Sequence, residues 1–419
     1  MNLNLPSWAG IKRDVKLKGA GVTQILHLYS NRKWTGPADH ALNLVSWLRS
    51  ERDFQVFFAC GRRKSLISHL QNKADERQIP HIDHLQLNKH LNWTILPDIL
   101  SLRKLVARET IDLIHSHQDN DALTAVLAGF GTRLVRTCYD GEPEPLYVRR
   151  RFVFHNTSRI LTASVRVKAY LSRVFPGKWI EQVDIPVDLK RFRPVRKSDK
   201  LRSEFGIDRD AVVGGIVARV QKHRNFPLLL SALEEVVREI PQFKFLIVGR
   251  GTHIDTIARE PIKRKGLEKN VIFTGYRGHD YPDVLNLFDY KVFLHPGSDG
   301  SCRAVREALA CGKPVVATRR GILPELIKDG ETGMLVDDHP HDLARAMITM
   351  YRENAYRQQC SHAARRYAEE ILRPERYVRK VLACYESFAA GDERGPNLLN
   401  DPNFFCSGFA FLGVIMPNF

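Results

Sequence analysis

Two carboxylates separated by seven residues, Asp299 and Glu307, stand where a predicted strand, loop and helix follow one another. Asp299 lies in the glycine-containing loop, and Glu307 lies about a turn and a half inside the helix. The first backbone N–H groups of a helix carry partial positive charge, so the helix start near Ser301 suits a phosphate. Carboxylates repel phosphate, so we expect both acids to accept hydrogen bonds from hydroxyls on either side of it. The pattern suits a nucleotide sugar, with ribose, diphosphate and hexose in a row. An ordinary strand–loop–helix turn with a capping aspartate is the alternative.

The elements around these carboxylates can be predicted from local patterns. The apolar run Lys291–His295 is typical of a buried strand. Ser301 is a plausible N-cap for a helix that runs to about Cys311. Gly312 suits the left-handed position that ends a helix, and Pro314 prevents its continuation. A further strand, Val315–Ala317, follows.

This stretch resembles the acidic-x7-acidic signature of retaining glycosyltransferase family 4. After Glu307 the chain continues Ala-Leu-Ala-Cys-Gly-Lys-Pro-Val-Val, close to the run that follows the second acid in that family. The resemblance implies an α/β fold of the GT-B type, with two Rossmann-like doubly wound domains facing a central cleft and C-terminal helices crossing back to the first domain. Asp299 is shorter than the family's glutamate, and Gly300-Ser301-Cys302 replaces Gly-Phe-Gly, which leaves the donor sugar open.

Length and composition indicate a globular protein with two domains. The chain has 419 residues, of which 43% are apolar and 26% charged. Its seven cysteines are scattered and form no C-x-x-C pair, which argues against a disulfide framework or structural zinc site and favours a reducing compartment. We identify no signal peptide at the start and no apolar run long enough to span a bilayer.

The net charge of +17 suits three kinds of partner: nucleic acid, an anionic membrane surface or a phosphorylated small molecule. No helix-turn-helix, zinc-finger or RRM pattern is present, so no nucleic acid is expected. The basic and aromatic segment Arg149–Asn156 suits anionic headgroups or an acidic acceptor, with a solvated helix face as the alternative.

The chain divides into five predicted parts. A proline-bracketed run, Ile185–Pro194, resembles the family's domain junction. The predicted parts are a flexible basic arm (1–20), an N-terminal acceptor-side Rossmann-like domain (21–186), a C-terminal nucleotide-sugar donor domain (187–360), crossover helices (361–390) and a tail of unknown structure (391–419).

The first predicted strand, Val22–Tyr29, is followed by a loop that contains Gly36 and by a helix from Ala38 to Ser50. Strand, glycine-bearing loop and helix open a doubly wound domain. The resemblance places this loop beside the donor diphosphate, and Gly36 would let the backbone approach a ligand closely. A plain turn glycine is the alternative.

Three candidates for the acceptor side follow two later strands: His117, Tyr139 and Asp140. The carboxyl ends of parallel strands are where ligands bind in such sheets. The family commonly has Thr-x-His where this chain has Thr137-Cys138-Tyr139, so which of the three candidates assists the reaction stays open. His115 and His117 alone are a poor metal signal, because no third ligand is evident.

Two arginines and a glycine–tyrosine pair complete the candidate donor site. In the resembled family an arginine and a lysine five positions later reach the donor phosphates, and here the pair is Arg219 and Arg224. Guanidinium groups keep their charge and can grip phosphate oxygens with two hydrogen bonds. Gly275 and Tyr276 occupy the segment that borders the nucleotide base in the family.

The resemblance implies a retaining hexosyltransferase that needs no metal and no cofactor besides its nucleotide-diphosphate sugar. Arg219, Arg224 and the helix start at Ser301, Cys302 and Arg303 would stabilise the departing diphosphate. Glu307 would hold the ribose and Asp299 the donor sugar.

The acceptor would be a glycan or lipid-linked molecule, and the protein would be cytoplasmic, with peripheral contact to the inner face of the cell membrane. Two other functions stay open, a sugar-nucleotide epimerase of the same fold and a basic nucleic-acid-binding protein.

Overall fold

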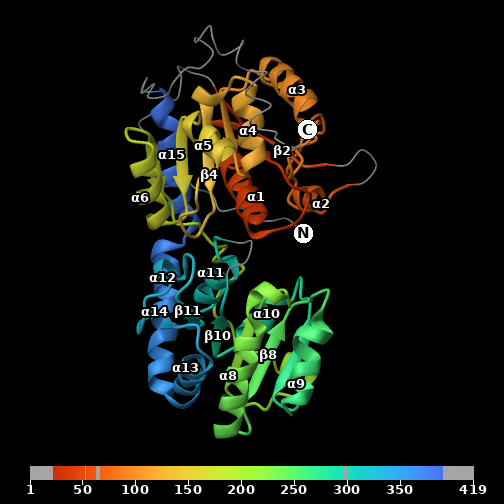
Figure 1. Cartoon of the computed structure of the whole chain (residues 1–419), viewed down its shortest axis with the longest axis vertical. Coiled ribbons are helices and arrows are strands. Elements are labelled where there is room, and N and C mark those ends of the chain that lie inside the picture. The colour runs from red at the N-terminus through yellow and green to blue at the C-terminus, as the bar shows by residue number, and fades with distance from the viewer. Residues whose placement is uncertain (1–21, 52, 63–66, 296–299, 390–419) are drawn as a thin grey trace. The chain divides into compact units, whose positions relative to one another are not determined.

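The computed structural model describes residues 22–51, 53–62, 67–295 and 300–389 (Figure 1). Its described residues form two compact units. The first contains the chain up to Val183 together with the segment from Tyr377 onward, and the second is Asp184–Arg376. The predicted arm (1–20) and tail (391–419) lie outside the described residues.

The first unit is built on a six-stranded parallel sheet with the order β2-β1-β3-β4-β5-β6. Its central strands are buried on both faces, which is why they do not show the alternating pattern of a half-buried strand. Ile25 in β1 stands opposite Val56 in β2 and Leu113 in β3. The strands are β1 (Thr23–Tyr29), β2 (Phe54–Cys60), β3 (Leu113–Ser116), β4 (Leu134–Cys138), β5 (Arg159–Thr162) and β6 (Trp179–Gln182).

Helices of this unit follow the strands in the alternation that a doubly wound sheet requires. Ser164 caps the start of α6 by accepting the N–H of Val167, and Thr35 caps α1 in the same way through Ala38. The helices are α1 (Gly36–Arg49), α2 (His69–Asp75), α3 (Ile95–Arg108), α4 (Asp119–Leu127), α5 (Val148–His155), α6 (Val165–Val174) and α15 (Pro374–Ala389), with a short 3-10 turn, η1 (Gly131–Arg133).

The last helix, α15, brings the C-terminal end of the described chain back to the first unit. The hydroxyl of Tyr385 lies 2.6 Å from Nδ1 of His115, and Nε of Arg159 donates to the hydroxyl of Ser387 at 3.0 Å. Residues 361–371 belong to α14 instead, which packs on α11 within the second unit. The return to the first unit therefore begins near Tyr377.

The second unit has its own six-stranded parallel sheet, with the order β12-β11-β10-β7-β8-β9. Val292 in β10 stands opposite Val316 in β11, and Lys291 stands opposite Gly215 in β7. The strands are β7 (Val213–Val217), β8 (Lys244–Val248), β9 (Val271–Gly275), β10 (Tyr290–Phe293), β11 (Val315–Thr318) and β12 (Gly333–Val336).

The helices of the second unit include α8, whose inner face is the largest apolar contribution to the core beside the sheet. They are α7 (Asp199–Glu204), α8 (Phe226–Glu239), α9 (Glu260–Arg264), α10 (Tyr281–Leu287), α11 (Arg303–Ala310), α12 (Leu323–Leu326), α13 (Pro340–Arg352) and α14 (Asn354–Ile371), with short turns η2 (Lys222–Arg224) and η3 (Asp255–Arg259).

The α/β class with two doubly wound parallel sheets, predicted from the sequence, is confirmed. Within the described part of the chain, every helix is too short or too polar to cross a bilayer.

Candidate functional site

The turn into α11 differs by one residue from the prediction. The N-cap is Cys302 and not Ser301, and the helix begins at Arg303. Cys302 has a φ of 51°, which is left-handed and rare for a residue with a side chain. Both Ser301 and Cys302 are buried, so the backbone here is set by packing and not by local preference. Gly312 has the predicted left-handed conformation at the other end, with a φ of 65°.

A buried arginine that the sequence did not single out holds this turn. Nε of Arg306 donates to the carbonyl of Ser301 at 2.8 Å, and its Nη1 donates to the carbonyl of Ile185 at 2.8 Å. Because Arg306 is almost completely buried, these bonds fix the loop before α11 to the first residues of the second unit. The sequence signal for this role is the position of Arg306 on the otherwise apolar inner face of the helix.

Glu307 is buried, and the side chains of Tyr281 and Arg303 lie against its carboxylate. The hydroxyl of Tyr281 in α10 donates to its Oε2 at 2.8 Å, and Nε of Arg303 lies 3.5 Å from its Oε1. The tyrosine ring is itself fixed by an edge-on contact with Phe192. Because this carboxylate is already oriented, it can accept hydrogen bonds from a ligand hydroxyl with little further loss of side-chain entropy.

Asp299, the other predicted carboxylate, lies outside the described residues, together with Pro296, Gly297 and Ser298. Its placement relative to Glu307 stays a prediction. The described chain resumes at Gly300, directly before the turn into α11.

A lysine lies beneath the first turn of α11. Lys291 in β10 is fully buried, and its Nζ donates to the carbonyl of Ala304 at 2.7 Å. Burial lowers the pKa of Lys291 from 10.5 to about 7, against the attraction of the Glu307 carboxylate. A lysine at the start of a predicted apolar strand was the sequence signal for this residue, but the prediction gave it no role.

The two predicted phosphate-binding arginines both follow β7, but the structure gives them different surroundings. Nη1 of Arg224 donates to the carbonyl of His295 at 2.7 Å, which brings Arg224 next to the loop that leads into α11. Arg219 is exposed. Since β7 and β10 are adjacent and parallel, both arginines leave the sheet at the edge where α11 begins.

Gly275 and Tyr276 lie at the carboxyl end of β9, which is separated from β10 by β7 and β8 in the sheet. Gly275 has a φ of 72°, which lets the chain turn sharply after the strand. Tyr276 is 60% exposed, and the guanidinium of Arg250 lies 4.9 Å from the centre of its ring. An exposed ring with a cation on one face leaves its other face available for stacking.

Gly36 belongs to the first unit and occupies the first position of α1, where Pro37 follows it. The predicted loop thus ends two residues earlier than expected, because Thr35 caps the helix. The hydroxyl of Tyr29 lies 2.9 Å from that of Thr35 and helps to fix the helix start.

His117 and Tyr139 form part of a buried chain of hydrogen bonds at the carboxyl ends of β1, β3 and β4. Nδ1 of His117 lies 2.9 Å from the Tyr139 hydroxyl, and its Nε2 lies 3.0 Å from Nδ1 of His27. Burial lowers the pKa of His27 to about 3 and holds the pKa of His117 well below its ordinary value. Both imidazoles are therefore neutral, and each carries one N–H and one acceptor nitrogen.

His27 supplies the third imidazole that the sequence did not reveal. One nitrogen from each of His27, His115 and His117 can be chosen so that all three lie within 4.8 Å of one another. However, the rings of His115 and His117 are stacked at 16°, so their in-plane lone pairs run side by side and do not converge. The nitrogens of His115 already lie 2.6 Å from the hydroxyl of Tyr385 and 2.7 Å from that of Thr137. These three residues fit a hydrogen-bonded core better than a metal site.

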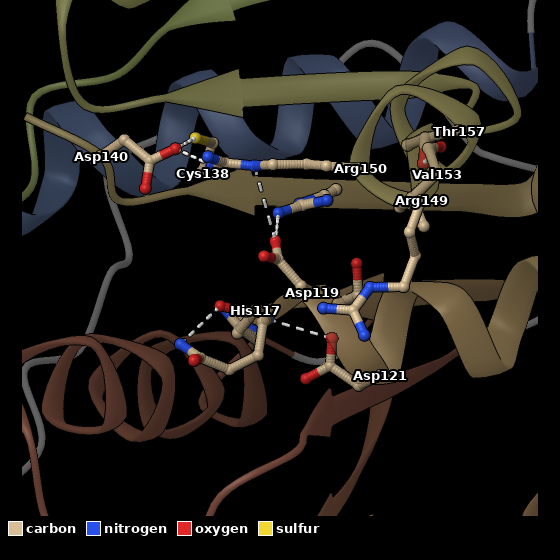
Figure 2. Close-up of polar contacts among 12 residues, drawn as sticks. His117, Asp119, Asp121, Cys138, Asp140, Arg149, Arg150, Val153 and Thr157 are labelled. Carbon is tan, nitrogen blue, oxygen red and sulfur yellow. Dashed lines mark hydrogen bonds and ion pairs between the residues drawn. The ribbon is translucent and has the colours of Figure 1, made fainter. Parts of the chain in front are cut away.

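Asp140 lies in a different environment. Its Oδ2 is paired with Nη2 of Arg150 and lies 2.9 Å from the thiol of Cys138, as Figure 2 shows. Arg150 also pairs with Glu144 at 2.9 Å and lies 3.9 Å from Asp119. The carboxyl of Asp140 is thus committed to a buried guanidinium.

Asp119 completes this ion network through Arg136 in β4. The two arginines hold the pKa of Asp119 below its usual value despite burial. Because Arg150 is buried and paired, the segment Arg149–Asn156 does not present its three arginines together to solvent. The solvated-face and headgroup interpretations of this segment therefore apply at most to Arg149 and Arg151.

Comparison with known proteins covers most of the chain. A family model described as Glycosyltransferase Family 4 matches residues 34–191, and one described as Glycosyl transferases group 1 matches residues 197–367. The chain is 27% identical over 345 residues to the GDP-mannose-dependent alpha-(1-6)-phosphatidylinositol monomannoside mannosyltransferase of Mycolicibacterium smegmatis, across 79% of this chain and 75% of that protein.

A second relative is the UDP-Gal:alpha-D-GlcNAc-diphosphoundecaprenol alpha-1,3-galactosyltransferase of Escherichia coli. It is 25% identical over 321 residues, across 69% of this chain and 78% of that protein. Among solved structures, HepE of Anabaena in complex with UDP superposes with a TM-score of 0.75 at 20% identity, across 87% of this chain and all of that one. A glycosyltransferase of Rickettsia africae gives a TM-score of 0.74 at 16% identity, across 87% of this chain and 98% of that one.

Proposed function

Because the chain belongs to glycosyltransferase family 4, with two family models that together span most of its length, we propose that it is a retaining hexosyltransferase acting on a nucleotide-diphosphate sugar. The relatives named above are glycosyltransferases, which favours transfer over the epimerase and nucleic-acid-binding alternatives. The observation that carries the proposal is the arrangement at α11: Glu307 within this helix is buried and oriented by the Tyr281 hydroxyl, and Arg224 donates to the carbonyl of His295 in the chain that leads toward the helix.

In the proposed reaction, the bond between the sugar and the diphosphate breaks while the acceptor hydroxyl forms a bond on the same face of the sugar. The acceptor proton passes to the leaving phosphate, so no base from the protein is needed. Negative charge that develops on the diphosphate would be stabilised by Arg219, Arg224 and the N–H groups at Ser301, Cys302 and Arg303. Glu307 would hold the ribose, Asp299 the hexose, and Gly36, Gly275 and Tyr276 would border the donor.

We propose that the transfer needs no metal. Two guanidinium groups and a helix terminus supply the positive charge that a divalent cation supplies elsewhere. The expected result is full activity in the presence of a chelator, compared with the same enzyme supplied with Mg²⁺ or Mn²⁺. A loss of activity on chelation that Mg²⁺ restores would contradict this part of the proposal.

The acceptor is proposed to be a glycan or a lipid-linked molecule of the cell envelope. The named relatives act on a phosphatidylinositol mannoside and on a diphosphoundecaprenol-linked sugar, and the net charge of +17 suits a phosphorylated acceptor. Such an acceptor would place the protein at the inner face of the cell membrane as a peripheral protein.

The first experiment is a thermal-shift panel of nucleotide sugars, because a bound ligand raises the apparent melting temperature by mass action. The preferred donor is then incubated with and without candidate acceptors, and the product anomer is determined by NMR. The proposal would be supported by slow hydrolysis of the donor alone and, with acceptor, by transfer that retains the anomeric configuration of the sugar. Clean conversion of the donor to an isomer would favour the epimerase.

Substitutions separate the roles of the site residues. Glu307→Ala should abolish donor binding, and Arg219→Ala should lower turnover more than donor affinity, since its charge matters most as the diphosphate departs. Glu260→Gln, an exposed change in α9 of the same unit, is the matched control. Unchanged turnover in both site variants would refute the assignment.

A further inference from the structure

One face of α3 is apolar and exposed although the opposite face belongs to the core of the first unit. Leu102, Leu105 and Val106 are buried in that core. On the other side Trp93 is 63% exposed, Leu96 42% and Leu100 60%. The positions i, i+3 and i+7 fall on one side of a helix, so these three side chains form a single stripe that begins just before α3.

Basic side chains continue and flank this stripe. Lys104 lies one turn beyond Leu100 on the same side and is exposed, as are Arg103 and, before the helix, Lys89. Arg103 also donates through Nε to the carbonyl of Ala128 at 3.0 Å, which fixes its position beside the stripe.

Acidic groups are directed away from the same face. Asp98, the only carboxylate inside α3, is buried and accepts the backbone N–H groups of Gln86 and Leu87 at 2.7 and 2.9 Å. Glu109, just past the helix, is paired with Arg108 at 2.7 Å. The exposed face of α3 is therefore apolar along its middle and cationic along its border, with no uncompensated carboxylate among its residues.

We propose that this α3 face, formed by Trp93, Leu96, Leu100 and Lys104, docks on an anionic lipid bilayer. Leucine and tryptophan side chains enter the boundary between headgroups and acyl chains, while lysine and arginine contact the headgroup phosphates. A protein partner would need matching carboxylates, whereas a bilayer supplies negative charge and apolar depth together. The inference deepens the proposed function, and rests on it only in that the bilayer would also present the lipid-linked acceptor.

The test is cosedimentation of the full chain with vesicles of phosphatidylcholine, either alone or mixed with phosphatidylglycerol. Binding is expected only to the anionic vesicles, and it should weaken as salt is added. Leu96→Gln combined with Leu100→Gln should reduce binding at least about tenfold, because two side chains lose their transfer into the interface. Lys104→Glu should reduce binding by about fivefold or more.

The matched control is Val165→Gln combined with Val195→Gln, which removes two exposed apolar side chains elsewhere and should leave binding unchanged. Circular dichroism and melting temperature establish that every variant is folded. The proposal is overturned if the wild type does not bind anionic vesicles, or if the Leu96→Gln/Leu100→Gln variant binds them as strongly as the wild type.

Sedimentation velocity on the same variants tests whether a second copy of the chain, and not a bilayer, covers the α3 face. If sedimentation velocity shows a lipid-free dimer that the α3 double variant converts to a monomer, and vesicles do not bind, the face is a contact between copies of the chain. Vesicle binding requires neither donor nor acceptor, so its failure is distinct from a failure of glycosyl transfer, which is assayed with a soluble acceptor.

Discussion

Replacement of Lys291 by methionine should make the protein more stable at neutral pH and remove a rise in stability toward alkaline pH. Lys291 is fully buried under α11, and its ammonium group donates a hydrogen bond to the carbonyl of Ala304. Burial lowers its pKa from 10.5 to about 7. Methionine has a similar length and no charge, so it fills the same space without the free-energy cost of burying an ammonium group.

The pKa values set both the size and the sign of the effect. The difference between 10.5 and about 7 corresponds to roughly 5 kcal/mol for holding the charged lysine in the folded state. Below pH 7 both the folded and the unfolded chain bind the proton, so the full cost is present. Between pH 7 and 10.5 only the unfolded chain binds it, so the free energy of unfolding rises with pH. From pH 6 to pH 9 this rise amounts to about 2–3 kcal/mol.

The assay is urea unfolding of wild type and Lys291→Met at several values between pH 6 and pH 9, followed by circular dichroism. All five tryptophans lie at or before Trp179, so their fluorescence reports the first unit and identifies its transition separately. The stability advantage of the variant should shrink by about 2–3 kcal/mol from pH 6 to pH 9. Lys244→Met in β8 is the control, because this less deeply placed lysine should show no such change.

A difference between Lys291→Met and wild type that stays constant across this pH range would refute the reasoning. It would mean that Lys291 remains protonated throughout, and that its bond to Ala304 and the nearby Glu307 outweigh burial. A variant that is less stable than wild type by the same amount at every pH would likewise show that Lys291 remains protonated in the folded protein.

Three further predictions concern single residues. Tyr281→Phe keeps the ring but removes the hydroxyl that orients Glu307, so calorimetry should show about fivefold to tenfold weaker donor binding; unchanged affinity would contradict this. Asp140→Asn leaves the buried guanidinium of Arg150 with less compensating charge and should lower the free energy of unfolding by about 2 kcal/mol, whereas exposed Glu142→Gln should not. Gly312→Ala forces a side chain into a φ of 65° against Ser361 and should cost about 1–2 kcal/mol in urea unfolding; a loss below the experimental error would refute the strain.

Local patterns predicted several strands in each of the two sheets. A buried parallel strand is a short apolar run, and the predicted strand Val22–Tyr29 differs from β1 (Thr23–Tyr29) by one residue. Glycine directly after a helix usually adopts the left-handed conformation that ends the helix, and Gly312 has that conformation. The turn into α11 was placed one residue too early, because the left-handed conformation of Cys302 is imposed by the buried surroundings and not by its own preference.

The sequence by itself thus determined the alternation of strands and helices and the position of Glu307 near the start of α11, because these depend on apolar period and on residues close in the chain. Only the tertiary structure decided which distant side chains meet. Tyr281 reaches Glu307 from α10, Lys291 supports α11 from β10, and His27 joins His117 from a neighbouring strand. Such contacts join residues that are 13 to 90 positions apart, and no local pattern encodes them, because burial and partner choice are properties of the packed core.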